Sequence, residues 1–133
     1  MSSTPTSEVV GHIQIPVPVT LETIQDILTT ACEGGITPWC CKAVARDAAT
    51  AYTKDFEFQL YDAEDGKRFE QNATFTYRPL NLENMLLGIG LWLSSSHSKG
   101  YRESTGAIDA GFMDANDADN IVQFAVFGEV VFG

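Results

Sequence analysis

Apolar residues recur every three or four positions in three parts of the chain, and this spacing predicts three helices. The first covers residues 21–32 and stops at the glycine pair 34–35. The second covers residues 82–95 and is apolar on most of its sides, so we expect either the central core helix or a subunit interface. The third follows Asp114, a good N-cap residue, and stops at Gly128.

Apolar and polar residues alternate in other parts of the chain, which predicts strands. Residues 39–44 form a short strand, and residues 54–77 form a β-hairpin with its turn at 62–66, where Gly66 supplies a positive φ. Residues 12–19 alternate too, but they contain two prolines, which cannot donate to a ladder. We therefore expect an edge strand there, or an extended arm that could also reach a second subunit.

This order of elements predicts an α+β fold with two layers, in which about three helices pack on a largely antiparallel sheet with a central hairpin. The length, 133 residues, is that of one domain. Residues 1–8 are small and polar, so we expect a flexible N-terminal tail followed by a single domain over 9–133. Without a secretory signal or a run of about 18 apolar residues, we expect no membrane association.

The chain is strongly acidic, with 18 Asp and Glu against 8 Lys and Arg, a formal net charge of -10. Such a chain is poorly suited to bind nucleic-acid phosphates directly. Residues 55–70 carry a net charge of -4 and residues 101–133 carry -5. An acidic surface of this kind either serves solubility or docks onto a basic groove of a protein partner. The candidate contacts are Asp55, Glu57, Asp62, Glu64, Asp65, Asp114, Asp117 and Asp119.

The sequence contains no motif typical of a catalytic or cofactor site. His97 lies among serines without the strained turn that exposes a nucleophilic serine, and no phosphate-binding loop is present. The acidic turn at 62–66 does not have calcium-loop spacing. Cys32, Cys40 and Cys41 are odd in number and lack zinc-ligand spacing, so we expect reduced thiols. We expect a protein without cofactor or metal that is not an enzyme.

Two stretches resemble small acidic proteins encoded by tailed phages and their prophages. They are residues 31–35 (ACEGG) followed by Trp39-Cys40, and residues 117–133 (DADNIVQFAVFGEVVFG). The resemblance implies an accessory protein made in the cytoplasm of the host cell. Blocking a bacterial defence system such as CRISPR–Cas, as a mimic of DNA or by steric hindrance, is one task of such proteins.

Three hypotheses about function follow from these observations. The first is a non-enzymatic inhibitor that binds a bacterial defence protein through the acidic surface. The second is a sponge for a nucleotide signal, that is, a protein that binds and sequesters a small nucleotide. The third is a virion or assembly protein. The sponge needs cationic residues beside a stacking aromatic ring, Trp39 or Tyr101. The available cations are Lys42, Arg46, Lys54, Arg78, Lys99 and Arg102. We also expect a homodimer, because the arm and the helix at 82–95 offer more apolar surface than one small sheet covers.

Overall fold

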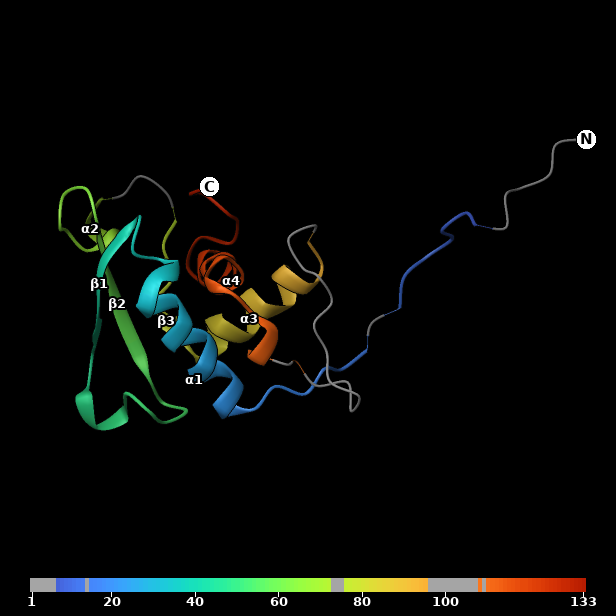
Figure 1. The fold of residues 1–133 in the computed structure, drawn as a ribbon, viewed down its shortest axis with the longest axis horizontal. Coiled ribbons are helices and arrows are strands. Elements are labelled where there is room, and N and C mark those ends of the chain that lie inside the picture. The colour runs from blue at the N-terminus through green and yellow to red at the C-terminus, as the bar shows by residue number, and fades with distance from the viewer. Residues whose placement is uncertain (1–6, 14, 73–75, 96–107, 109) are drawn as a thin grey trace, which may run out of the picture.

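The computed structural model describes residues 7–13, 15–72, 76–95, 108 and 110–133, and it shows helices packed on an antiparallel sheet (Figure 1). This arrangement confirms the predicted α+β class. The three longer helices are α1 (Leu21–Thr30), α3 (Leu82–Leu93) and α4 (Ala115–Phe127). The strands, in their order across the sheet, are β1 (Cys40–Ala45), β2 (Glu57–Asp62) and β3 (Leu80–Asn81). Shorter helical segments are a π turn (Ala31–Gly35), α2 (Phe69–Asn72) and two 3₁₀ turns, Ala48–Thr50 and Ala110–Phe112.

Local sequence explains where the helices begin and end. The Thr20 hydroxyl accepts the Thr23 N–H (3.1 Å) at the start of α1. The Asn81 side chain caps α3 in the same way. Gly35, at the end of the π turn, has no room for a side chain, since an added Cβ would lie 2.6 Å from the Ala115 carbonyl oxygen. The end of the first helical region therefore touches the start of α4 directly.

Helix α4 is the central element of the fold. Except for Asp119, every residue from Asp117 to Phe127 is buried. The helix lies among α1, α3 and the sheet, while Leu86, Leu87 and Leu91 of α3 remain exposed to solvent. Of the two alternatives for residues 82–95, the central core helix is therefore wrong, and the subunit interface stays a prediction. Position between neighbours, more than mean hydropathy, decides which helix is buried.

The sheet pairs differently from the predicted hairpin. Strand β2 pairs with β1, from Lys42 opposite Tyr61 to Ala45 opposite Phe58. The predicted return strand over 67–77 forms only at its start, where Arg68 pairs with Tyr61 in an isolated antiparallel bridge, because Phe69 lies in the one-turn helix α2. The reason is aromatic packing, since the Phe69 ring contacts the rings of Trp39 and Phe127 at centroid distances of 5.5 and 5.4 Å.

Tyr77 takes over part of the role of the missing return strand. Its hydroxyl accepts the N–H of Leu60 (3.2 Å), which a strand carbonyl would otherwise accept. Burial raises the pKa of Tyr77 to about 12, so the hydroxyl stays protonated at neutral pH. The acidic turn at the other end of β2 forms as predicted, with Gly66 at φ 71°.

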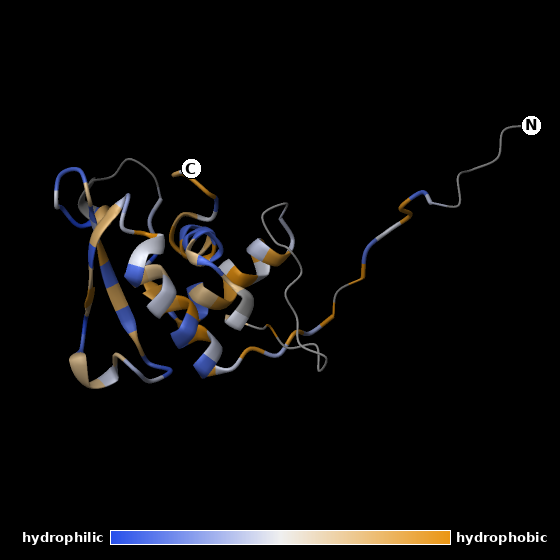
Figure 2. Cartoon of the chain, in the orientation of Figure 1, coloured by the Kyte–Doolittle hydropathy of each residue, from blue (hydrophilic) through white to orange (hydrophobic). Residues whose placement is uncertain are grey.

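Residues 7–19, as far as they are described, form an extended arm with no strand pairing, so of the two alternatives for residues 12–19 the extended arm holds and the edge strand does not. Pro16 and Pro18 lack the N–H that a ladder requires. Val17 and Val19 pack against the core, and Ile13 and Ile15 line an open cavity with Leu86 of α3. Beyond them the arm extends away from the body and carries apolar residues (Figure 2).

Two expectations concern other parts of the chain. His97, which we expected among serines without a catalytic turn, falls outside the described residues. No helix in the described part of the chain is long and apolar enough to cross a membrane.

Candidate protein-binding face

The charges of the chain are divided unevenly along the sequence. All eight lysines and arginines lie in residues 42–102, together with eight aspartates and glutamates, so this stretch is neutral. The net charge of -10 therefore comes entirely from residues 1–41 and 103–133. The fold packs α1 and the π turn, from the first stretch, against α4 from the second. The two stretches without basic residues thus meet in space.

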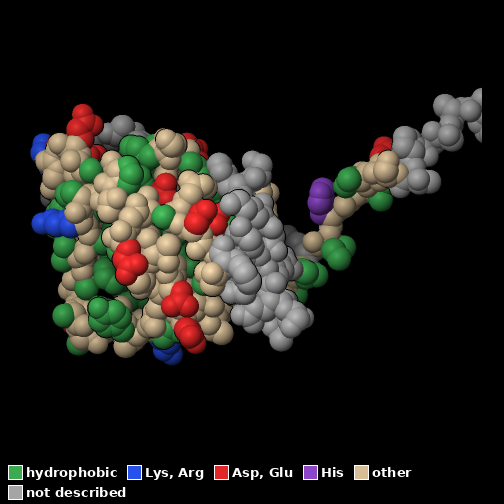
Figure 3. All heavy atoms as spheres, in the orientation of Figure 1, with side chains coloured by type: hydrophobic (Ala, Val, Ile, Leu, Met, Phe, Trp, Pro, Cys, Tyr) green, Lys and Arg blue, Asp and Glu red, His purple; other side chains and the backbone are tan. Residues whose placement is uncertain are grey.

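Helix α1 and the π turn present acidic side chains to solvent. Glu22, Asp26 and Glu33 are all exposed, and their spacings of four and seven residues place them on one side of the helical region. Figure 3 shows acidic side chains over α1 and beside it, with basic side chains only toward the margin of the view. We call Glu22, Asp26 and Glu33 the acidic face.

Sequence reasoning missed this acidic face because it counted charges by segment. The hairpin segment 55–70 holds many acidic residues, but basic residues lie before, within and after it. Two signals could have indicated α1 instead. One is the helical spacing of the three acidic residues, and the other is that the first basic residue of the chain is Lys42.

Asp119 of α4 lies near the end of the π turn. It lines a cavity of about 320 Å³ together with Gly34, Gly35 and Trp39. The Trp39 indole N–H donates to Asp119 Oδ1 (2.6 Å), and Gln123 Nε2 donates to the same oxygen (2.9 Å). Partial burial raises the pKa of Asp119, and the two hydrogen bonds oppose that shift.

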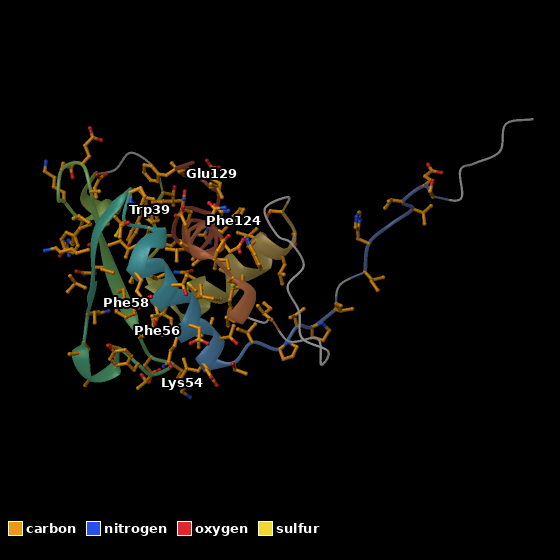
Figure 4. The ribbon with its side chains drawn as sticks, viewed as in Figure 1. Trp39, Lys54, Phe56, Phe58, Phe124 and Glu129 are labelled. Atoms are coloured by element: carbon orange, nitrogen blue, oxygen red, sulfur yellow. The ribbon has the colours of Figure 1, made fainter. Side chains whose placement is uncertain are left out.

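Gln123 connects this carboxylate to the C-terminal segment. The side chain is fully buried. Its Oε1 accepts the N–H groups of Val131 (2.8 Å) and Phe132 (2.7 Å), while its Nε2 donates to the Phe132 carbonyl (2.9 Å) as well as to Asp119. The Phe132 ring stacks on Trp39 with an interplanar angle of 2°. Trp39, between the sheet and α4 in Figure 4, is thereby fixed on several sides.

The five predicted contacts of the hairpin segment lie in two separate places. Asp55 and Glu57 are at the start of β2, whereas Asp62, Glu64 and Asp65 are at the turn after it. Strand β2 has six residues and separates the two groups by about 17 Å. Glu57 also pairs with Arg46 (3.1 Å), which neutralises its charge locally. The structure therefore does not assemble these five residues into one patch.

The other three predicted contacts lie in or next to the first turn and a half of α4. Asp114 is exposed and caps the helix by accepting the Asp117 N–H (2.8 Å). Asp117 completes a capping box and is only 1% exposed, so it is not accessible to a partner, contrary to the expectation. Asp119 is half-buried and holds Trp39. Asp114 therefore remains the most accessible of the three.

The structure does not gather the cations proposed for a nucleotide site. Arg46 pairs with Glu57, and Lys42 lies over the Tyr61 ring at 4.4 Å on the outer side of the sheet. Trp39 is buried against Phe132, so its ring is not free to stack on a base. Lys54 and Arg78 lie on separate segments, before β2 and before β3, and Lys99, Tyr101 and Arg102 lie outside the described residues.

The cysteines are free thiols. Cys40 is buried, and burial raises its pKa to about 11, while Cys32 and Cys41 are exposed. Partial burial and the nearby Glu33 raise the pKa of Cys32 as well. Within the described residues, no group of three or more His, Cys, Asp or Glu side chains could hold a metal ion.

The chain matches no protein-family model, no curated protein and no solved structure.

Proposed function

We propose that this protein is a non-enzymatic inhibitor that binds a basic surface of a protein partner through the acidic face. The observation that carries the proposal is that α1 and the π turn present Glu22, Asp26 and Glu33 to solvent, in a stretch of the chain that has no lysine or arginine before Lys42. Acidic side chains held on rigid helices present a negative field in a fixed arrangement, and such a field steers association with a basic groove.

The resemblance to small acidic phage proteins supplies the biological setting of the proposal. The partner is a bacterial defence protein in the host cytoplasm, such as a nucleic-acid-handling effector of a CRISPR–Cas system. Such an effector has a basic groove for nucleic acid. A negative face that occupies this groove excludes DNA without any chemical step, and the chain itself does not bind nucleic acid.

The test compares two triple variants with the same net charge. One reverses the acidic face (Glu22→Lys, Asp26→Lys, Glu33→Lys), and the control reverses three exposed residues of the neutral stretch (Asp55→Lys, Glu64→Lys, Glu83→Lys). Because each substitution adds two positive charges, both variants have a net charge of -4. Any difference between them reports the position of the charges.

The measurement is phage plaquing on bacteria that carry a defined defence system and express each variant. We expect the unmodified chain and the control variant to restore plaquing, and the acidic-face variant to lose this effect. Binding of the purified chain to the effector should also weaken with added salt. Equal loss in both triple variants would refute a specific role for the acidic face, and no effect of the unmodified chain on any system would refute inhibition of defence.

A further inference from the structure

Strand β1 has an unpaired edge. It is the first strand in the order β1-β2-β3, so it pairs with β2 alone. The Arg46 N–H donates to the Glu57 carbonyl (2.8 Å). In an antiparallel ladder such bonds alternate, so the backbone groups of Ala43 and Ala45 point away from β2. Within the described residues, no other backbone group bonds to them.

An apolar cleft lies beside this edge. It has a volume of about 280 Å³ and opens between α1 and the sheet. Leu28 of α1 and Cys32 of the π turn line it on one side, and Ala43 and Phe58 line it from the strands. An edge strand beside a helix, with a cleft between them, can take up an extended segment as an additional strand whose alternate side chains enter the cleft.

The N-terminal arm has the properties of such a segment. Ile13 is 87% exposed and Ile15 is 56% exposed, and the two alternate with polar residues as in a strand. Residues 9–15 contain no proline, and these seven residues are long enough to pair along the six residues of β1. Pro16 and Pro18 then end any ladder at the point where Val17 returns to its own core.

The arm leaves the body on the side opposite β1 (Figure 1). The arm therefore points away from the β1 edge of its own chain. The β1 edge of a second copy is the better binding site for the arm. We propose that residues 9–15 of one copy add as a strand to β1 of a second copy, with Ile13 and Ile15 in the cleft, and that the second copy reciprocates. The exchange forms a twofold dimer in which each cleft is completed by the partner.

Light scattering after size exclusion, from about 1 to about 100 µM of the full chain, tests the proposal. We expect a concentration-dependent dimer. The arm variant Ile13→Asp with Ile15→Asp should raise the dissociation constant about a hundredfold, because two isoleucines leave the cleft. The control Leu87→Asp changes an exposed leucine of α3 outside the proposed contact and should leave dimerisation unchanged.

A second variant acts on the other side of the contact. Ala43→Pro removes an N–H that the fold does not use, so an edge strand tolerates it, but an added strand cannot bond there. Each variant alone should be a monomer at low concentration. An equimolar mixture of the arm variant and the Ala43→Pro variant should form heterodimers, because the mixture retains one intact arm and one intact edge.

A synthetic peptide of residues 7–16 provides a measurement that requires no variant. It should compete for the cleft and dissociate the dimer of the unmodified chain. A monomer over the whole concentration range would overturn the proposal. That result is expected if the arm instead binds to α3 of its own chain, where Ile13 and Ile15 line a cavity with Leu86. A dimer that survives both the arm and the Ala43→Pro substitutions would overturn it equally.

Discussion

Helices α3 and α4 lie against each other, but they relate to solvent in opposite ways. Helix α3 has the more apolar sequence, LENMLLGIGLWL, yet Leu86, Leu87 and Leu91 are exposed. Helix α4 contains Asn120 and Gln123 and is nevertheless buried along most of its length. The difference shows that the number of packed neighbours decides burial, and that a polar side chain is accommodated inside when its hydrogen bonds are satisfied. The predictions below test this contrast, at protein concentrations where the chain is monomeric.

The largest effect is expected at Gln123 of α4. Gln123→Ala removes four hydrogen bonds at once and leaves the Val131 and Phe132 N–H groups without an acceptor. We expect a loss of about 4 kcal/mol in the free energy of unfolding, measured by urea denaturation. Gln25→Ala is the control, since that exposed side chain donates one hydrogen bond to the Tyr52 carbonyl and should cost less than about 1 kcal/mol. Equal losses for both would show that burial adds nothing to the role of Gln123.

The next effect concerns the contact between the two helices. A Cβ at Gly88 would lie 2.8 Å from both the Ala125 nitrogen and the Ile121 carbonyl oxygen, so Gly88→Ala should push α3 and α4 apart and cost about 3 kcal/mol. Gly90→Ala, one position beyond Ile89 on the same helix, meets nothing within 4 Å. We expect Gly90→Ala to stabilise the helix by about 0.5 kcal/mol. Similar destabilisation by both substitutions would contradict the close approach at Gly88.

A smaller, pH-dependent effect is expected at Asp119. Since its folded pKa is raised above the unfolded value of 3.8, the folded state holds the proton more tightly, and stability falls as pH rises through the raised pKa. Asp119→Asn keeps an acceptor for Trp39 and Gln123, because both donate to the same oxygen. In the variant, the free energy of unfolding should no longer fall over this pH range. We expect the fall in the unmodified chain to be under about 1 kcal/mol, because the carboxyl group is only half-buried. Denaturation from pH 3.5 to 7 measures it, and an unchanged pH slope would assign the decline to another group.

The smallest effect is expected on the outer side of α3. Leu87→Gln should change the free energy of unfolding by less than about 0.5 kcal/mol, because Leu87 is 49% exposed. Ile89→Gln, two residues away and 2% exposed, should cost about 3 kcal/mol or more. The same urea titrations compare them. A large loss at Leu87 would show that something covers this side of α3.

The parts of the fold that sequence predicts well are those decided by neighbouring residues. Asp114 caps α4 and Gly128 ends it at φ 77°, as expected from residue type alone. Pairing across the sheet was not predictable in this way. Phe69 lies in helix α2 where a return strand was predicted, and its ring packs against Trp39 and Phe127, which are far from it and from each other in sequence.

The candidate site shows the same limit. The acidic character of the chain was evident from its composition, but the acidic face depends on which side of α1 and the π turn is exposed to solvent. Asp117 looked like a surface charge and is a buried capping residue. Charge counted along a sequence does not report which carboxylates face solvent.

The stack of Phe132 on Trp39 has a consequence for how the protein is made. The two stacked rings belong to residues 93 positions apart in sequence. Gln123 can form all of its hydrogen bonds only when residues 131 and 132 are in place beside it. Contacts of such long sequence separation form late, because the intervening chain must be closed first. A nascent chain that stalls on the ribosome before residue 132 has emerged should thus remain open to proteases, and protection should begin only once that residue is free.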